Sequence, residues 1–191
     1  IIIEKKEKLE LFKWNIKGDN IKIEIPSTLI ASIDDDTSNG AIILNDIEAN
    51  NIYMDTSNGE IIVENVNVKE DIKIDTSNGG IEVLNVSAEN IILDSSNSEA
   101  ILNNINGKKI KVDISNGEIK VNECRGNKVV LDTSNGEIEA YECYANNLKL
   151  DTSNAEITLE NLKDKEFVID ILEVSTSNAS ENINAKYNNK K

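Results

Sequence analysis

The sequence lacks histidine altogether, and this absence excludes several classes of active site. None of its 191 residues is His, so Ser-His-Asp triads, Cys-His pairs and His-based zinc sites are excluded together. Arg125 is the only arginine, and no glycine-rich phosphate-binding loop occurs. The Asp residues recur uniformly along the chain and do not form one distinguished site. The sequence therefore predicts a protein that is not an enzyme and that uses no metal ion or other cofactor.

Aromatic residues, proline and cysteine are also scarce. Aromatics make up 4% of the chain, with one Pro and two Cys, which is too few Cys for a disulfide scaffold. No stretch approaches the roughly 18 apolar residues that a membrane span needs, so we expect no span in these residues. Because the chain opens with Ile1, we expect an export signal or anchor in a preceding segment.

Positive charge is outweighed by negative charge, with 20 Lys and Arg against 35 Asp and Glu. The formal net charge is −15, with a pI near 4.4. Contacts to phosphates need clustered Lys and Arg, so this balance argues against nucleic acid and anionic lipid as partners. The simplest interpretation of the negative charge is that it keeps a long exposed surface soluble.

One five-residue phrase, Asp-Thr-Ser-Asn-Gly, organises what is present. It is complete at residues 36–40 and returns, complete or altered, from Asp55, Asp75, Asp94, Asp113, Asp132, Asp151 and Ser175. The steps between copies are 19, 20, 19, 19, 19 and 19 residues, then 24. Such a short period indicates supersecondary units that bury their apolar side only against their neighbours.

The apolar residues around each copy alternate with a spacing of two, as they do in strands. From Asp55 to Asp151, aliphatic residues or Met stand three and one before each Asp. Two more follow the phrase, and a third comes three residues later, at positions such as Val66, Cys124 and Leu162. Equivalent residues recur in one order, so in-register stacking pairs successive coils in parallel. We therefore predict an all-β, single-domain parallel β-solenoid (β-helix) of about eight coils with a 19-residue period.

Both ends of the chain depart from the repeat. Residues 1–35 are expected to form N-terminal cap strands, with Phe12 and Trp14 closing the core and Pro26 ending a strand. Residues 36–179 carry the repeats, and an insertion of about five residues within 163–173 precedes a C-terminal cap. Residues 180–191 are expected to be a polar, frayed tail.

The Asn of the phrase is its most regular member. It is identical in all eight copies, whereas Gly is replaced by Ser98, Ala155 and Ala179. We expect this Asn either to adopt a left-handed conformation or to point inward in a hydrogen-bonded amide ladder. The predicted ladder consists of Asn39, Asn58, Asn78, Asn97, Asn116, Asn135, Asn154 and Asn178.

The repeated phrase, followed by Glu-Ile and preceded by an Ile-x-Ile-Pro entry at 23–26, resembles a bacterial family of β-strand-repeat domains to which an adhesin role is ascribed. The resemblance covers roughly residues 21–179. It implies a β-solenoid exposed at the cell envelope or outside the cell, beside an anchor or other surface modules. No catalytic residue is implied.

These observations favour a non-catalytic surface module, an adhesin or a structural scaffold, whose partner is a protein or a cell-wall or host glycan. Two alternatives remain: a polysaccharide-active β-helix enzyme and an intracellular structural scaffold. We expect a monomer. Arg125, Tyr141 and Tyr144 are the one place where outward aromatics gather, and they form a candidate surface-binding patch.

Two further groups have two interpretations each. Cys124 and Cys143 share one inward column and are either buried thiols or, with strained geometry, a disulfide. The repeated Asp residues stack about 4.8 Å apart, and their repulsion is offset either by Lys73, Lys111 and Lys149 or by Ca²⁺ between Asp94 and Asp113. The lysines are the preferred explanation.

Overall fold

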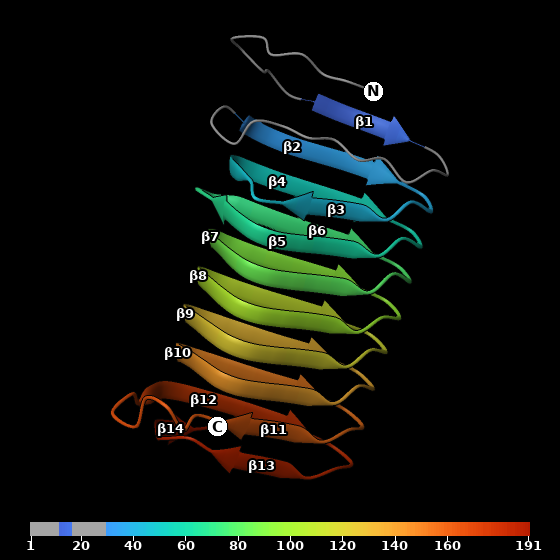
Figure 1. The fold of residues 1–191 in the computed structure, drawn as a ribbon. Coiled ribbons are helices and arrows are strands. Elements are labelled where there is room, and N and C mark those ends of the chain that lie inside the picture. The colour runs from blue at the N-terminus through green and yellow to red at the C-terminus, as the bar shows by residue number, and fades with distance from the viewer. Residues whose placement is uncertain (1–11, 17–29) are drawn as a thin grey trace.

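The computed structural model describes residues 12–16 and 30–191, with side chains from Ser32 onward. Within these residues every regular element is a strand (Figure 1). The strands are β1 (Phe12–Ile16), β2 (Ile30–Thr37), β3 (Ile42–Asn45), β4 (Glu48–Thr56), β5 (Ile61–Val68), β6 (Asp71–Thr76), β7 (Ile81–Ser95), β8 (Ala100–Ile114), β9 (Ile119–Thr133), β10 (Ile138–Thr152), β11 (Ile157–Glu160), β12 (Ile169–Thr176), β13 (Glu181–Asn184) and β14 (Tyr187–Lys190).

Successive coils pair in parallel and in register. Asp94 lies opposite Asp113, and Asp113 lies opposite Asp132. Figure 1 shows a flattened solenoid whose chain runs along a front layer, which contains β3, β5 and β11, and returns along a back layer, which contains β4, β6 and β12. The predicted all-β parallel β-solenoid is confirmed.

Aliphatic side chains from both layers fill the space between them. In the back layer Ile91, Ile110 and Val129 stack in one fully buried column. The front layer contributes equivalent columns that include Ile119 and Ile138. Each coil therefore buries its apolar face against the coils on either side, as the repeat requires.

Six coils turn at one edge through a residue with left-handed backbone, which we call the corner residue. These residues have φ between 53° and 59° and are Asp46, Asn65, Asn85, Asn104, Glu123 and Glu142. Asn and Asp tolerate this conformation better than most residues do. The corner explains why the spacing of inward residues widens from two to three, for example between Val63 and Val66. Asn65, Asn85 and Asn104 also form a ladder of amide hydrogen bonds there.

The Asp-Thr-Ser-Asn-Gly phrase forms the arc at the opposite edge. Its Thr points inward and closes the turn: Gly136 N donates to Thr133 Oγ1 (3.3 Å), which donates to the Gly117 carbonyl of the preceding coil (2.9 Å). The eight Asn residues of the phrase form a ladder whose amide bonds measure 2.7 to 3.0 Å.

This ladder lies on the outer surface, so the expectation of inward-pointing Asn was wrong. The expectation of left-handed backbone was also wrong, because the left-handed residues lie at the corner. The reason is that Thr, with both a donor and an acceptor on a short side chain, occupies the inward position of the arc.

The structure tests the expected C-terminal end fully and the expected N-terminal end only in part. The predicted cap at 1–35 lies mostly outside the described residues, but β1 pairs in parallel with β2 as a further coil would. Residues 180–191, expected as a tail, contain β13 and β14, which pair with β11 and β12. Leu162, expected inward, is 48% exposed because the chain leaves the coil there.

Candidate functional site

The regular course of the described coils is interrupted between β11 and β12, where residues 161–168 form a loop that projects from the corner edge (Figure 1). Loops on rigid scaffolds often carry binding or catalytic residues. This loop and the corner beneath it are therefore the first candidate site. The predicted insertion lies here.

Asn161 fixes the start of the loop. Its side-chain Oδ1 accepts a hydrogen bond from Cys143 N, and its Nδ2 donates to Cys143 O, both at 2.8 Å. The carboxamide thus takes the place of a backbone peptide of the next coil, which is missing at this point. Asn161 keeps both polar groups of a buried residue satisfied.

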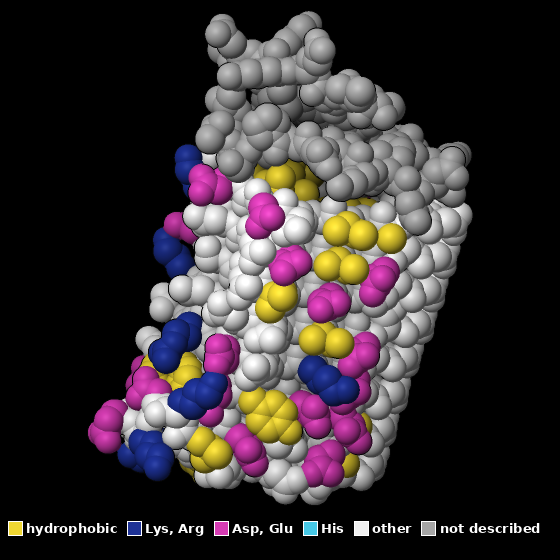
Figure 2. Space-filling model, viewed as in Figure 1, with side chains coloured by type: hydrophobic (Ala, Val, Ile, Leu, Met, Phe, Trp, Pro, Cys, Tyr) yellow, Lys and Arg dark blue, Asp and Glu magenta, His cyan; other side chains and the backbone are white. Residues whose placement is uncertain are grey.

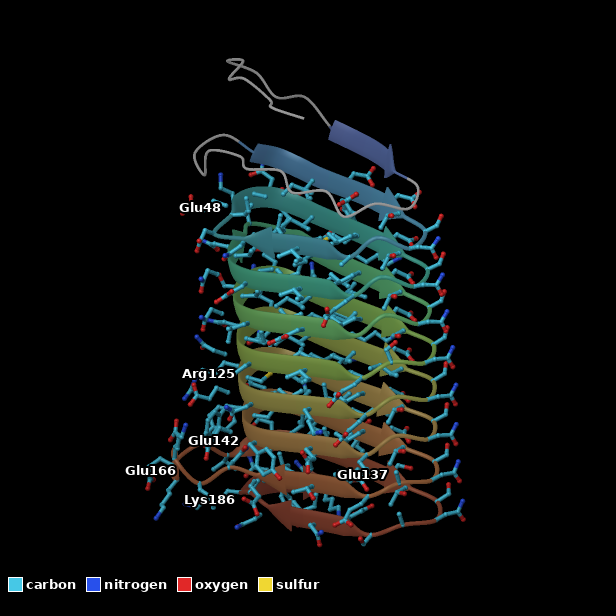
Figure 3. All side chains as sticks on the ribbon, turned by 45° about the vertical axis from the view of Figure 1, so that its right-hand side comes forward. Glu48, Arg125, Glu137, Glu142, Glu166 and Lys186 are labelled. Atoms are coloured by element: carbon cyan, nitrogen blue, oxygen red, sulfur yellow. The ribbon has the colours of Figure 1, made fainter. Side chains whose placement is uncertain are left out.

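Glu142 holds the next residues of the loop. Its carboxylate accepts hydrogen bonds from the backbone N–H groups of Leu162 and Lys163, each at 3.1 Å, and from the Tyr144 hydroxyl. Burial raises the pKa of Glu142, but the bonds from Tyr144, Lys163 and Leu162 outweigh burial and hold this pKa below its usual value. Figure 3 shows Glu142 at the corner edge, near the loop that carries Glu166.

Tyr144 packs beneath the loop. Its ring contacts Phe167 edge-on, with centroids 5.2 Å apart, and the Arg125 guanidinium lies 4.5 Å from its centroid. Its hydroxyl accepts a hydrogen bond from Asp164 N at 2.8 Å. Burial, together with the bond to Glu142, raises the pKa of Tyr144. These contacts make Tyr144 an anchor for the loop.

The three residues of the expected surface patch therefore do not gather on one exposed surface. Arg125 and Tyr144 are in contact, but Tyr144 is only 4% exposed. Tyr141 lies on the front layer, opposite Asn122 and Glu160. Tyr141 and Tyr144 are separated because the corner residue Glu142 turns the chain between them, a turn that the sequence analysis did not place.

Lysines neutralise part of the Asp column on the back layer, the explanation preferred from the sequence. Lys111 lies 2.7 Å from Asp113, Lys149 lies 2.8 Å from Asp151, and Lys73 lies 3.6 Å from Asp75.

Asp94 has no such lysine in its own coil, because Ile92 occupies the equivalent position. Burial and the neighbouring Asp113 and Asp75 raise the pKa of Asp94. Asp55, whose coil has Tyr53 at this position, has its pKa raised by burial and by Asp75 and Asp36 in the same way.

A second group of carboxylates lies at the arc side of the front layer, where Figure 3 labels Glu137. Ligand oxygens of Glu118, Glu137 and Glu139 lie within 4.8 Å of one another. Lys120 Nζ lies 2.9 Å from Glu118, a member of this group, and 3.1 Å from Glu99 in the preceding coil, and these bonds raise the pKa of Lys120. Within the group Lys120 therefore compensates Glu118 alone, and we assign no metal to the group, because exposed carboxylates commonly gather without one.

Cys124 and Cys143 are buried free thiols that lie opposite each other in neighbouring coils. A hydrogen bond with Cys143, together with burial, raises the pKa of the Cys124 thiol. Both residues act as small core side chains, the first of the two interpretations given above.

Among the described residues, no helix has the length and apolar character that crossing a bilayer requires. Searches of curated proteins and of solved structures found no match. The family model described as Toastrack DUF4097 matches residues 3–140. This match includes the expected N-terminal cap and ends near the start of β10. Because it spans more than half of the 191 residues, the chain belongs to the Toastrack DUF4097 family.

Proposed function

We propose that the protein is a non-catalytic module of the cell envelope or cell surface, an adhesin or structural scaffold that binds a protein or a glycan. The observation that carries this proposal is how the polar groups around the loop at 161–168 are used. Among the described coils this loop is the clearest departure from the repeat, and the polar groups of Asn161, Glu142 and Tyr144 all bind backbone there. What the coils offer to a partner is their long repeated outer surface.

The enzyme alternative would use Asp or Glu residues in a groove. The carboxylates of the two columns are spread along the solenoid, and several are paired with lysines of the same or the next coil. Acid and base catalysis needs a few groups whose environments give them different pKa values. A column of equivalent residues repeats one environment from coil to coil. This contrast favours binding over hydrolysis.

The experiment has two parts. The purified protein is incubated with cell-wall polysaccharide and with intact cells, and both retention and released reducing sugar are measured. Retention without release supports the proposal. Sugar release that disappears in Asp132→Asn or Glu137→Gln would establish the enzyme alternative. Cell fractionation with a tagged full-length protein tests the location, and recovery in the cytosol alone would favour the intracellular scaffold.

A further inference from the structure

We infer that the N-terminal half of the front layer is a docking surface for a basic amphipathic helix of a partner protein. The outer side of this layer is a grid in which each coil presents three outward residues. In four consecutive coils the grid holds four large aliphatic residues, which we call the apolar stripe: Ile43, Ile62, Leu84 and Ile101.

The stripe is exposed and spans two neighbouring columns, because Glu82 interrupts the first column and Leu84 lies in the second. Ile43 is 66% exposed and Ile101 is 40% exposed, while Ile62 and Leu84 are partly exposed. Ile43 lies opposite Ile62. In the next coil Glu82 lies opposite Ile62 and Ile101, and Leu84 follows two residues after Glu82. Figure 2 shows hydrophobic side chains interspersed with acidic ones on the face turned to the viewer. Isolated exposed apolar residues are ordinary, whereas a contiguous patch indicates an interface.

The acidic residues around the stripe define the charge of the partner. Glu60, Glu64 and Glu82 form no ion pair with any residue that the structure describes. In the C-terminal half of the same layer, Lys120 pairs with Glu118 and Glu99. An apolar surface with carboxylates on both sides complements a segment that carries Lys or Arg beside its apolar residues. A second copy of this chain would bring a net charge of −15 to the same surface, so it is the less favourable occupant.

The spacing of the stripe favours a helix over a strand. Coils stack about 4.8 Å apart, so the stripe advances by this interval per coil along the solenoid axis, with Leu84 displaced to one side. A helix that lies along the solenoid axis offers one apolar residue about every 5.4 Å, at positions i, i+4 and i+7. An extended strand offers residues of one face only about every 6.6 Å. The four coils span roughly 14 Å, which matches two to three helical turns.

This inference rests on the proposed binding role, but it does not depend on glycan binding or on location. The probe is a fluorescent model peptide of Leu and Lys arranged as an amphipathic helix. A peptide of the same composition in scrambled order is the control. Binding is measured by fluorescence anisotropy at two salt concentrations, and circular dichroism checks the fold of each variant.

We expect the double variant Ile43→Ser and Ile101→Ser to weaken binding of the amphipathic peptide by at least tenfold. The matched variant Ile92→Ser and Val130→Ser, at outward positions of the back layer, should bind as the wild type does. Glu64→Gln with Glu82→Gln should weaken binding and reduce its salt dependence. Asp94→Asn with Asp132→Asn removes the same charge from the back layer and should change binding less.

Equal binding of the scrambled peptide, or equal loss in the front and back variants, would overturn the inference and leave only non-specific attraction to an acidic protein. Dimerisation at micromolar concentration that the Ile43→Ser and Ile101→Ser variant abolishes would assign the stripe to a second copy instead. If the wild-type protein bound the amphipathic peptide but was not retained on cell wall or cells, the proposed function would be contradicted. The docking role of the stripe would still be supported.

Discussion

Lys190 and Glu181 form an ion pair across the C-terminal end of the core, with Lys190 Nζ 2.7 Å from Glu181 Oε2. Both occupy inward columns, because Glu181 lies opposite Ile157 and Lys190 lies opposite Leu172 in the preceding coil. The pair joins the front and back layers at the place where a further coil would stack. Inward-pointing charges on edge strands oppose edge-to-edge growth.

Replacing this pair with apolar residues should make the protein associate end to end. In Glu181→Ile with Lys190→Leu, the last coil would expose an apolar core surface and unpaired strand edges. We expect concentration-dependent dimers or longer species in analytical ultracentrifugation. The control, Asn182→Ile with Asn189→Leu, adds the same side chains at outward positions and should associate less. Equal association of both variants would contradict a specific role for the charge pair.

Asn161→Ala should destabilise the C-terminal coils. It removes both hydrogen bonds to the Cys143 backbone, and each buried backbone group left unsatisfied costs about 1–3 kcal/mol. Urea unfolding measures the change. Asn103→Ala, which loses one exposed bond to Asn122 of 3.3 Å, is the control and should change the unfolding free energy by less than about 0.5 kcal/mol. If the two variants were equally stable, the carboxamide would not replace the missing peptide.

Gly117→Ala should destabilise the fold, whereas Gly80→Ala should not. A Cβ atom at Gly117 would lie 1.8 Å from the Ser98 carbonyl oxygen, and one at Gly80 would have no atom within 4 Å. The expected cost at Gly117 is about 1–3 kcal/mol. We do not expect a larger cost, because Ser98 and Ala155 occupy the same column and show that a coil can shift to accept a Cβ atom. Thermal unfolding of the two variants tests this, and equal Tm values would contradict it.

The repeat architecture could be predicted because the period, the aliphatic alternation and the register all follow from residue types at fixed spacing. The Lys and Asp pairs could be predicted for the same reason, since Lys111 and Asp113 share a face two residues apart. The corner could not be placed with the same reasoning. Asn65, Asn85 and Asn104 carry a signal for it, namely a second recurrent Asn where the inward spacing widens, but Asp46, Glu123 and Glu142 occupy the same position in other coils and weaken that signal.

The site around Tyr144 could not be predicted because its contacts join residues far apart in the sequence. Phe167 and Asp164 reach Tyr144 only because the loop folds back over the corner. An outward aromatic in one coil becomes buried when an insertion in a later coil covers it. Sequence periodicity contains no information on where such an insertion packs.

Asp94→Asn should stabilise the protein near pH 7 by up to about 1 kcal/mol. Burial, Asp113 and Asp75 raise the pKa of Asp94 in the folded state, so the charged form opposes folding above that pKa. As pH falls through the raised pKa, Asp94 takes up a proton and this penalty is lost. The advantage of the variant should therefore shrink towards about pH 4 and below, as urea unfolding across this range would show.

Asp151→Asn is the matched control, because Lys149 lies 2.8 Å from Asp151. Removing that carboxylate leaves Lys149 with the more distant Asp132, 3.3 Å away. This variant should be neutral or slightly destabilised near pH 7. Stabilisation of both variants by the same amount would show that net charge, and not the missing lysine, determines the effect.

Calcium should stabilise the protein little. The Asp94 and Asp113 carboxylates were the candidate ligands, but Lys111 already lies 2.7 Å from Asp113, and a Ca²⁺ ion would have to displace it. Ca²⁺ prefers six to eight oxygen ligands, and Ile92 contributes none to this part of the column. We expect millimolar CaCl₂ to raise Tm no more than NaCl of matched ionic strength does. A larger, Ca²⁺-specific rise that disappears in Asp94→Asn would establish a metal site in the Asp column, and one that disappears in Glu137→Gln would place it at the front-layer carboxylates instead.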